Sequence, residues 1–178
     1  MAWSTPLTAV STATLTAAQW NATVRDNLNE TAPAKATTAG GIFVATGTNA
    51  IAQRIPTGNT IATSQISTAT TYGDLATSGP AVTVTTGTQA IVCVTVSLNN
   101  STVGASSRAD FAVSGATTRA AVDNTALIHE VANANQGFRA TAVTLITLTA
   151  GSNTFTVKYR TSGGTGTFND RSILVLPL

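Results

Sequence analysis

Few residues of this chain have types and spacing that could do chemistry. Its one histidine, His129, lies in segment 127–131, which has the composition of a strand. A usual zinc site needs several Cys, His or carboxylate ligands, and no serine stands in the G-x-S-x-G setting of an activated nucleophile. We therefore interpret His129 as a strand residue with a satisfied hydrogen bond, and we expect no catalytic residue, no metal site and no cofactor.

Paired carboxyl groups would predict hydrolysis of a polysaccharide, which needs two of them on opposite sides of the bond. Asp110 and Asp170 start or lie in predicted strands, each close to an arginine, Arg108 and Arg171 respectively. This spacing favours local ion pairs or hydrogen-bond acceptors in turns over an acid and a base. A polysaccharide-degrading enzyme that uses Asp110 or Asp170 is kept as an alternative, and so is a plain carbohydrate-binding module.

The charge of the chain argues against a nucleic-acid-binding protein. Only 9% of the residues are charged and the net charge is +2, against roughly 25% charged residues in an average protein. The basic residues are scattered, and only Lys158 and Arg160 stand close together, so no stripe could neutralise phosphates. The Gly-rich segment 162–167 lacks the Lys-Ser/Thr ending of a phosphate-binding loop and is predicted to be a hairpin loop. We expect no nucleic-acid partner, and no stretch predicts a membrane span.

The elements that would position these residues are mostly β. Thr, Val, Ala and Gly dominate, and β-branched residues favour a pleated surface. Short alternating segments with turn residues between them predict strands from residue 81 onward, at 81–86, 89–98, 108–114, 126–131, 138–149, 153–160 and 171–176. This pattern is typical of an antiparallel, jelly-roll-like β-sandwich. Cys93, in the second of these strands, is predicted to be a buried small apolar residue.

The last predicted strand is apolar on both faces. It contains Ile173, Val175 and Leu176, with Leu178 just after it, and we expect it to be buried on both sides. It is either a central strand of the sandwich, or a strand whose second face packs against sister subunits around a symmetry axis. These four residues are therefore a candidate subunit interface.

A short helix is predicted near the N-terminus. Thr16 and Gln19 have the spacing of a capping box, and Leu15 and Trp20 that of a hydrophobic staple. Trp20, Val24 and Leu28 then form one apolar stripe. A helix of about three turns is marginal in water unless something covers its stripe. Either the C-terminal domain covers it, or a neighbouring subunit or virion protein does.

Residues 32–80 are predicted to be an extended arm, which is a tethered arm, a linker or one strand of an intertwined oligomer. The chain thus divides into an attachment region, 1–80, and a sandwich, 81–178. The arm has too few large apolar residues to bury a core of its own. Within it, 41–45 and 50–55 flank the turn residues 46–49 and predict a hairpin. This hairpin contributes Ile42, Phe43 and Ile51 to the candidate attachment residues.

Three regions of the sequence, near the N-terminus, in the predicted hairpin and at the C-terminus, resemble parts of known virion proteins. The N-terminal runs Trp3-Ser4-Thr5-Pro6, Leu15-Thr16-Ala17-Ala18-Gln19-Trp20-Asn21 and Val24-Arg25-Asp26-Asn27-Leu28, continuing into 32–40, resemble the opening of small virion proteins of phages that infect actinobacteria. The run 42–52 resembles a hairpin unit of phage fibre proteins. Segments 154–160 and 168–178 look like the last strands of their C-terminal β-domains. The resemblance covers about half the chain, and it brings no catalytic residues with it.

The resemblance implies a non-enzymatic structural protein on the virion surface, with itself, as a homotrimer, and a major capsid protein or tail protein as partners. Its attachment residues would be Trp3, Leu15, Trp20, Val24, Leu28, Ile42, Phe43 and Ile51. The short chain favours a capsid decoration or head-fibre protein. The alternative is a short tail fibre that binds host glycans through loops 99–107 and 162–167, with Tyr159 or Phe168 as stacking residues.

Overall fold

The computed structural model describes residues 4–5, 7–8 and 10–178, so the predicted attachment residue Trp3 lies outside the described residues. The chain forms two compact units, Met1–Ile55, to which Leu178 is also assigned, and Pro56–Pro177. Half of the residues are in strands, and the prediction of a mostly β protein with a short N-terminal helix and an antiparallel sandwich is confirmed.

The first unit begins with one continuous helical segment. It consists of α1 (Ala17–Trp20), a π-helical turn η1 (Asn21–Arg25) and α2 (Asp26–Leu28). The predicted capping box is present: Gln19 N donates to Thr16 Oγ1 at 3.2 Å, and Thr16 N donates to Gln19 Oε1 at 3.0 Å. Asn27 is buried and holds the extended N-terminal chain against the helix, because its Oδ1 accepts from Ser4 N at 2.9 Å.

A hairpin completes this unit. After α3 (Ala32–Lys35), strands β1 (Ile42–Gly47) and β2 (Ala50–Arg54) pair antiparallel, as the sequence predicts. The Gln53 side chain joins β2 to the preceding loop, since its Oε1 accepts from Thr37 N at 2.8 Å and its Nε2 donates to Thr38 O at 2.5 Å.

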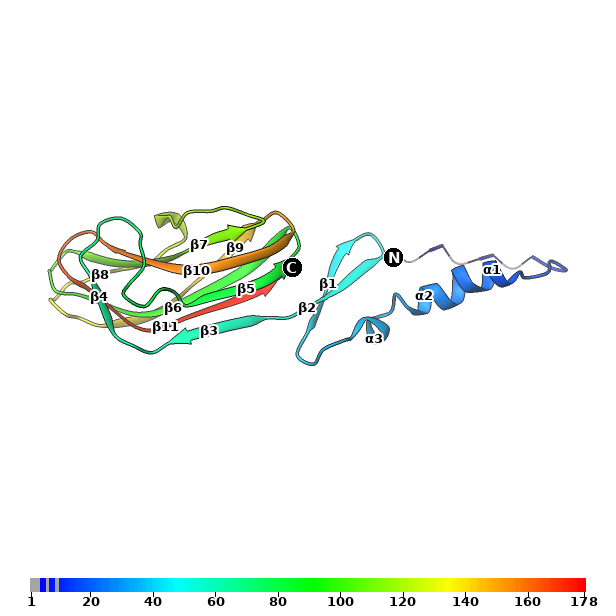
Figure 1. Ribbon diagram of the computed structural model, residues 1–178, viewed down its shortest axis with the longest axis horizontal. Helices are drawn as coiled ribbons and strands as arrows, with labels where there is room; N and C mark the ends of the chain where they lie inside the picture. The colour runs from blue at the N-terminus through cyan, green and yellow to red at the C-terminus, as the bar shows by residue number, and fades with distance from the viewer. Residues whose placement is uncertain (1–3, 6, 9) are drawn as a thin grey trace. The chain divides into compact units, whose positions relative to one another are not determined.

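The second unit is a sandwich of two antiparallel sheets (Figure 1). The four-stranded sheet has the order β5 (Ala81–Thr86), β10 (Gly151–Thr161), β7 (Ser106–Gly115) and β8 (Leu127–Glu130). The five-stranded sheet has the order β3 (Thr57–Ile61), β11 (Gly166–Pro177), β6 (Gln89–Asn100) and β9 (Phe138–Thr147), with β4 (Gln65–Ser67) also paired to β11. A 3-10 turn, η2 (Asp123–Thr125), precedes β8. Most consecutive strands lie in opposite sheets, which is the connectivity of a jelly roll.

The core lies between the two sheets and follows from strict alternation along the strands. On β6, every second residue from Ala90 to Asn100 is buried, and on β10 the buried positions run from Asn153 to Thr161. Alternate side chains of a strand point to opposite faces, so each sheet places one row of Val, Leu and Phe into the core. Phe111, Phe155, Phe168 and Tyr159 are its largest ring-bearing members.

The boundary of the sandwich differs from the predicted one. Strands β3 and β4 lie within the expected arm, yet both pair with β11 and belong to the five-stranded sheet. The unit therefore starts at Pro56 rather than at residue 81. The apolar content of the sequence could not predict that β3 and β4 belong to the sandwich. These strands contribute main-chain hydrogen bonds to the edge of the sheet but few side chains to the core.

Strand β11 is also not buried on both faces. Ile173 and Val175 are 2% and 0% exposed in the core, so these two members of the candidate subunit interface are not accessible to a sister subunit. Leu174 and Leu176 lie on the opposite face, and Leu174 is 46% exposed. The strand is apolar on both faces, but only one face is covered by the rest of this chain.

Candidate functional site

Three of the predicted attachment residues come together in the first unit. Leu15, Trp20 and Val24 line a cavity of about 470 Å³, together with Leu7 and Val10 from the extended N-terminal chain. Trp20 remains 53% exposed, and Leu15 and Leu28 are exposed as well. The helix therefore keeps much of its apolar stripe in contact with solvent.

The hairpin residues of the predicted set lie on two different faces of β1 and β2. Phe43 and Ile51 share one face, because Phe43 pairs with Gln53 and Ala45 with Ile51. Ile42 pairs with Arg54 and points to the other face. Phe43 is exposed, whereas Ile42 and Ile51 are half-buried. The hairpin thus offers one exposed aromatic ring rather than a three-residue surface.

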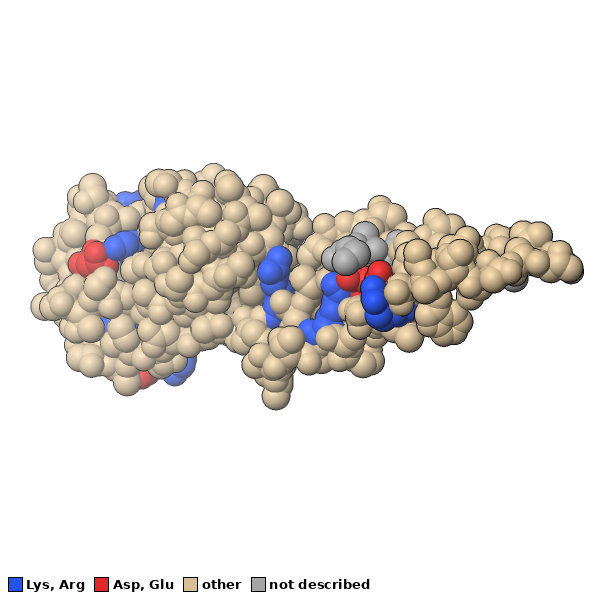
Figure 2. Space-filling model, turned by 45° about the vertical axis from the view of Figure 1, so that its right-hand side comes forward, with Lys and Arg blue, Asp and Glu red and all other residues tan. Residues whose placement is uncertain are grey.

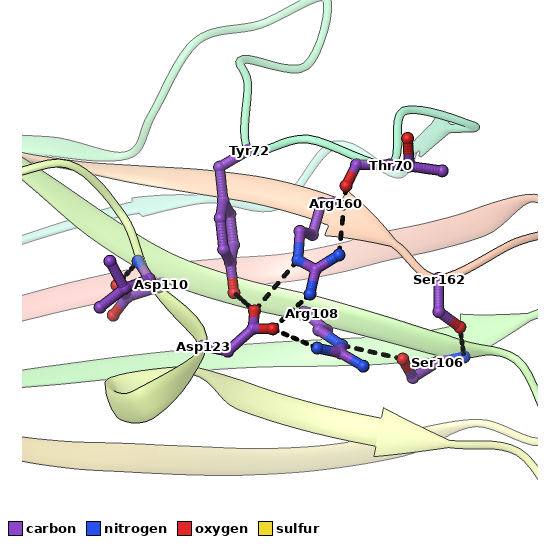
Figure 3. Close-up of polar contacts among 9 residues, drawn as sticks. Thr70, Tyr72, Ser106, Arg108, Asp110, Asp123, Arg160 and Ser162 are labelled. Atoms are coloured by element: carbon purple, nitrogen blue, oxygen red, sulfur yellow. Dashed lines mark hydrogen bonds and ion pairs between the residues drawn. The ribbon is translucent and has the colours of Figure 1, made fainter.

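The densest polar cluster of the described chain lies on the four-stranded sheet and centres on Asp123 (Figure 3). Arg160 of β10 donates from Nε to Asp123 Oδ1 at 3.0 Å and pairs with Oδ2 as well. Arg108 of β7 also pairs with Asp123, and Tyr72 donates its hydroxyl to Oδ1 at 2.9 Å. Arg160 further donates to Thr70 O at 3.1 Å. The cluster thus joins segment 69–74, η2 and two strands.

These contacts shift the ionisation of their members. The pKa of Asp123 is lowered to about 2, mainly by the hydrogen bond from Arg160. The hydrogen bond from Tyr72 and the charge of Arg108 lower it further. Burial and then the hydrogen bond to Asp123 raise the pKa of Tyr72 well above its ordinary value. Burial opposes ionisation of Asp74, but the hydrogen bonds from Lys158 and Ser78 outweigh it and lower its pKa. At neutral pH the Asp123 cluster therefore holds an ionised carboxylate beside two guanidinium groups and a neutral phenol.

A groove of about 770 Å³ runs beside this cluster. Its polar lining comes from Tyr72, Asp74, Asp123, Lys158 and Arg160, and small residues such as Gly73 and Ala112 form its floor and walls. Two of these lining residues, Lys158 and Asp74, pair with each other at 2.6 Å. Hydroxyl groups, carboxylates and guanidinium groups beside a phenol ring are the side chains that can bind a sugar through its hydroxyls and its apolar face.

A second carboxylate, Asp110, lies next to this groove but is fully buried. It accepts from Val122 N at 2.7 Å and from Thr125 Oγ1 at 2.9 Å, and Arg119 pairs with it at 3.1 Å. Arg119 also contacts the Phe111 ring, 4.3 Å from its centroid. All partners come from segment 119–125, so Asp110 anchors the loop that carries Asp123.

The ion pairs expected for Asp110 and Asp170 are wrong in their partners. Arg108 pairs with Asp123 rather than with Asp110, and Asp170 pairs with Arg139 at 3.7 Å. Arg171 is fully buried and donates to the carbonyls of Thr77, Gly79 and Thr63 at 3.2–3.3 Å. Asp110 and Asp170 lie in different sheets, so they do not face each other across a site.

The predicted glycan loops do come together, but not their stacking residues. Segments 99–107 and 162–167 are joined by hydrogen bonds from Ser101 N to Thr165 O at 2.9 Å and from Asn100 Nδ2 to Gly163 O at 3.0 Å. Tyr159 and Phe168 are 1% and 0% exposed and pack against each other in the core, 4.9 Å between ring centroids. They are not available to stack on a sugar.

His129 and Cys93 are the two remaining residues that the sequence analysis singled out. His129 Nε2 lies 3.0 Å from Gln136 O and its ring stacks on Phe138, so its interpretation as a strand residue with a satisfied hydrogen bond is confirmed. Cys93 is on a strand as predicted, but it is only half-buried, because its side chain points to the outer face of the five-stranded sheet.

Sequence reasoning missed Tyr72 and Asp123. They lie 51 positions apart, and each stands alone in a segment rich in small residues, so no spacing rule could join them. The clue was indirect: Arg108 and Arg160 fall on outward positions of their strands, alongside Asp110 and Lys158. Without a carboxylate opposite them, the guanidinium groups of these two arginines would have to stay hydrated.

Among the described residues, no group of three His, Cys, Asp or Glu side chains is placed to hold a metal ion. None of the described helices is long and apolar enough to cross a membrane. No protein-family model matches the chain, and no curated protein matches its sequence.

Proposed function

We propose that this chain is a non-enzymatic structural protein of a tailed-phage particle, a capsid decoration or head-fibre protein that forms a homotrimer. The first unit attaches to a capsid or tail protein, and the sandwich is displayed at the virion surface. The sequence resemblance supports the phage assignment. The observation that supports attachment is that the first unit exposes Trp20, Leu15, Leu28 and Phe43.

Burial explains why such side chains suit attachment. A fully buried large apolar side chain contributes about 1.5–3 kcal/mol relative to the exposed state. Trp20 and Leu28 would gain most of this only on a partner, since more than half of each side chain's surface is exposed here. A helix that is marginal alone would also be stabilised by that partner.

Co-sedimentation tests the attachment. Particles grown without this protein are mixed with the purified full-length chain and sedimented. We expect the wild-type chain to bind and the double variant Trp20→Ala, Leu28→Ala to bind at least about tenfold more weakly, because two apolar anchors are truncated. Val103→Ala, an equally exposed apolar residue of the sandwich, is the matched control and should bind normally. Equal binding of all three proteins would contradict the role of this helix.

A second candidate, a short tail fibre or receptor-binding protein, is favoured by the groove beside Tyr72. Its phenol, carboxylate and guanidinium groups could bind a host glycan. In that case the purified protein should block adsorption of the phage to its host, and Tyr72→Ala should abolish the block. Normal adsorption in excess protein would leave decoration as the better proposal.

A further inference from the structure

The outer face of the five-stranded sheet carries a continuous apolar patch. Register places the outward side chains of β11, β6 and β9 side by side in two adjacent rows. The first row is Leu174, Cys93 and Val143, and the second is Leu176, Ile91 and Leu145. We call these six residues the outer patch. Three strands thus contribute two apolar side chains each to one surface.

The outer patch is exposed to solvent in the single chain. Val143, Leu145 and Leu174 are 66%, 58% and 46% exposed. Isolated apolar residues are common at protein surfaces, but contiguous apolar rows mark interaction surfaces. Gly58 of β3 lies beside Leu174 and has no side chain. A hollow of about 540 Å³ therefore opens next to the patch, lined also by Thr60, Cys93 and Ser172.

The rest of this face is nearly free of charge. The strands of this sheet contain three charged residues, of which Arg171 points into the core. The other two, Arg139 and Asp170, pair with each other at 3.7 Å. The row next to the patch is made of hydroxyl groups, and Thr95 and Thr141 are hydrogen-bonded at 2.7 Å. A charged partner would lose its hydration here and gain no opposite charge in return.

The outer face of the other sheet differs, because it carries charged side chains and is flanked by loops of the chain itself. Gly73 bridges to Tyr159 of β10, and Arg119 bridges to Val113 of β7. The outward Lys158, Arg160 and Arg108 of that sheet are held in ion pairs with Asp74 and Asp123. In Figure 2 most of the visible surface of the sandwich is tan, and its charged side chains lie in a few small groups. The two sheets therefore differ: one outer face carries paired charges and a polar groove, and the other is open and apolar.

The open face has the size of a stable interface. With strands about 4.8 Å apart and about 3.4 Å per residue, three strands over ten residues and β3 over five present on the order of 570 Å², near the lower end of the range for one partner of a stable interface. A standard interface buries about 800 Å² on each partner. The patch would form its apolar centre and the hydroxyl row its polar rim, which is the usual anatomy of such interfaces.

We propose that the outer patch is the subunit interface and that its occupant is a second copy of this chain. A partner must be neutral and apolar to match this face, and the face itself has that chemistry. In a two-fold dimer one patch meets the same patch of the second copy, and around a three-fold axis every subunit turns the same face toward its neighbours. This explains why β11 is apolar on both faces: Ile173 and Val175 serve the core, and Leu174 and Leu176 serve the neighbour. The proposal rests on the homotrimer of the proposed function and gives it an interface, but it does not depend on attachment to a particle.

The test uses the full-length chain and the double variant Val143→Lys, Leu145→Lys. Light scattering after size exclusion should give an oligomer for the wild type, and 18.0 kDa, the mass of one chain, for the variant. Both residues are exposed within the chain, so circular dichroism should show the same strand content. Val103→Lys, at a residue 62% exposed in the loop between β6 and β7, is the matched control and should stay oligomeric.

Cys93 provides a second readout, because it is the one cysteine of the chain and belongs to the patch. Alkylation by N-ethylmaleimide should be slow in the wild-type oligomer and severalfold faster in the double variant. A wild-type protein of 18.0 kDa would overturn the proposal. So would an oligomer in which Cys93 reacts as fast as in the double variant, since its subunits would be joined elsewhere. Neither result would affect binding to particles, which the co-sedimentation measures separately.

Discussion

Arg160 and Asp123 are hydrogen-bonded at 3.0 Å between Nε and Oδ1, although they lie 37 positions apart in the chain. The contact joins β10 to the turn η2, and Arg108 and Tyr72 converge on the same carboxylate. The Asp123 cluster therefore fixes segment 69–74 and segment 119–125 on one sheet. These two segments form most of the lining of the polar groove, so the groove depends on the cluster for its shape.

Removing the charge of Asp123 should loosen both segments without unfolding the sandwich. We expect Asp123→Asn to lower the free energy of unfolding by about 1 kcal/mol, because partly exposed ion pairs contribute little each. Hydrogen exchange should rise in 69–74 and 119–125. Asp170→Asn, which breaks the longer and more exposed pair with Arg139, is the control and should cost less. An equal loss in the two variants would contradict the special role of Asp123.

Acid should destabilise the folded protein in part by protonating Asp123. The pKa of Asp123 is lowered to about 2 from an ordinary 3.8, and that of Asp74 is lowered as well. Groups with a depressed pKa in the folded protein contribute stability that is complete above the unfolded pKa and is lost as the pH falls through the folded one. Urea unfolding should therefore show a loss of stability between about pH 4 and pH 2. This loss should be smaller in Asp123→Asn, and an unchanged pH profile in that variant would exclude the assignment.

Asp110 should matter more for stability than Asp123. It is fully buried, and its partners Val122 N, Thr125 and Arg119 all donate to it. In Asp110→Asn an amide donor faces other donors and Arg119 loses its counter-charge. We expect a loss of about 3 kcal/mol, the range for breaking a buried pair. Chemical denaturation measures it, and a loss smaller than that of Asp123→Asn would be inconsistent with this packing.

Arg171 should fix segment 62–79 to the sandwich. Its guanidinium group is buried and reaches three carbonyls, those of Thr63, Thr77 and Gly79. Arg171→Met keeps an unbranched apolar stem but leaves these carbonyls without that donor. We expect a loss of about 2–4 kcal/mol and faster hydrogen exchange in 62–79. Arg139→Met, at an exposed arginine of the same sheet, should have little effect on either.

The capping box should control both the helix and attachment. Thr16→Ala removes the acceptor for Gln19 N and should cost about 1 kcal/mol of helix stability. Circular dichroism should report less helix, and binding to particles should weaken in parallel. Thr14→Ala, two residues before the box, is the control. If helix content fell and particle binding did not, the folded helix would not be the element that binds.

The strands and the helix could be predicted because their signals are local. Alternation in β6 and β10 and the Thr16–Gln19 spacing report the surroundings of single elements. The role of 57–67 could not be predicted in this way, since β3 and β4 are held by the edge of β11. The Asp123 cluster could not be predicted either, because its members come from four segments that are far apart in the sequence. The apolar character of both faces of β11 was visible in the sequence, but only the sandwich shows which face the core uses.

The most direct test of the proposed function is the protein content of purified particles of the phage that encodes the chain. Mass spectrometry of particles from a density gradient should find this chain at many copies per particle, and particles from a phage lacking its gene should lose it. If the chain were found in the infected-cell lysate but not in the particles, the proposal of a virion structural protein would be wrong.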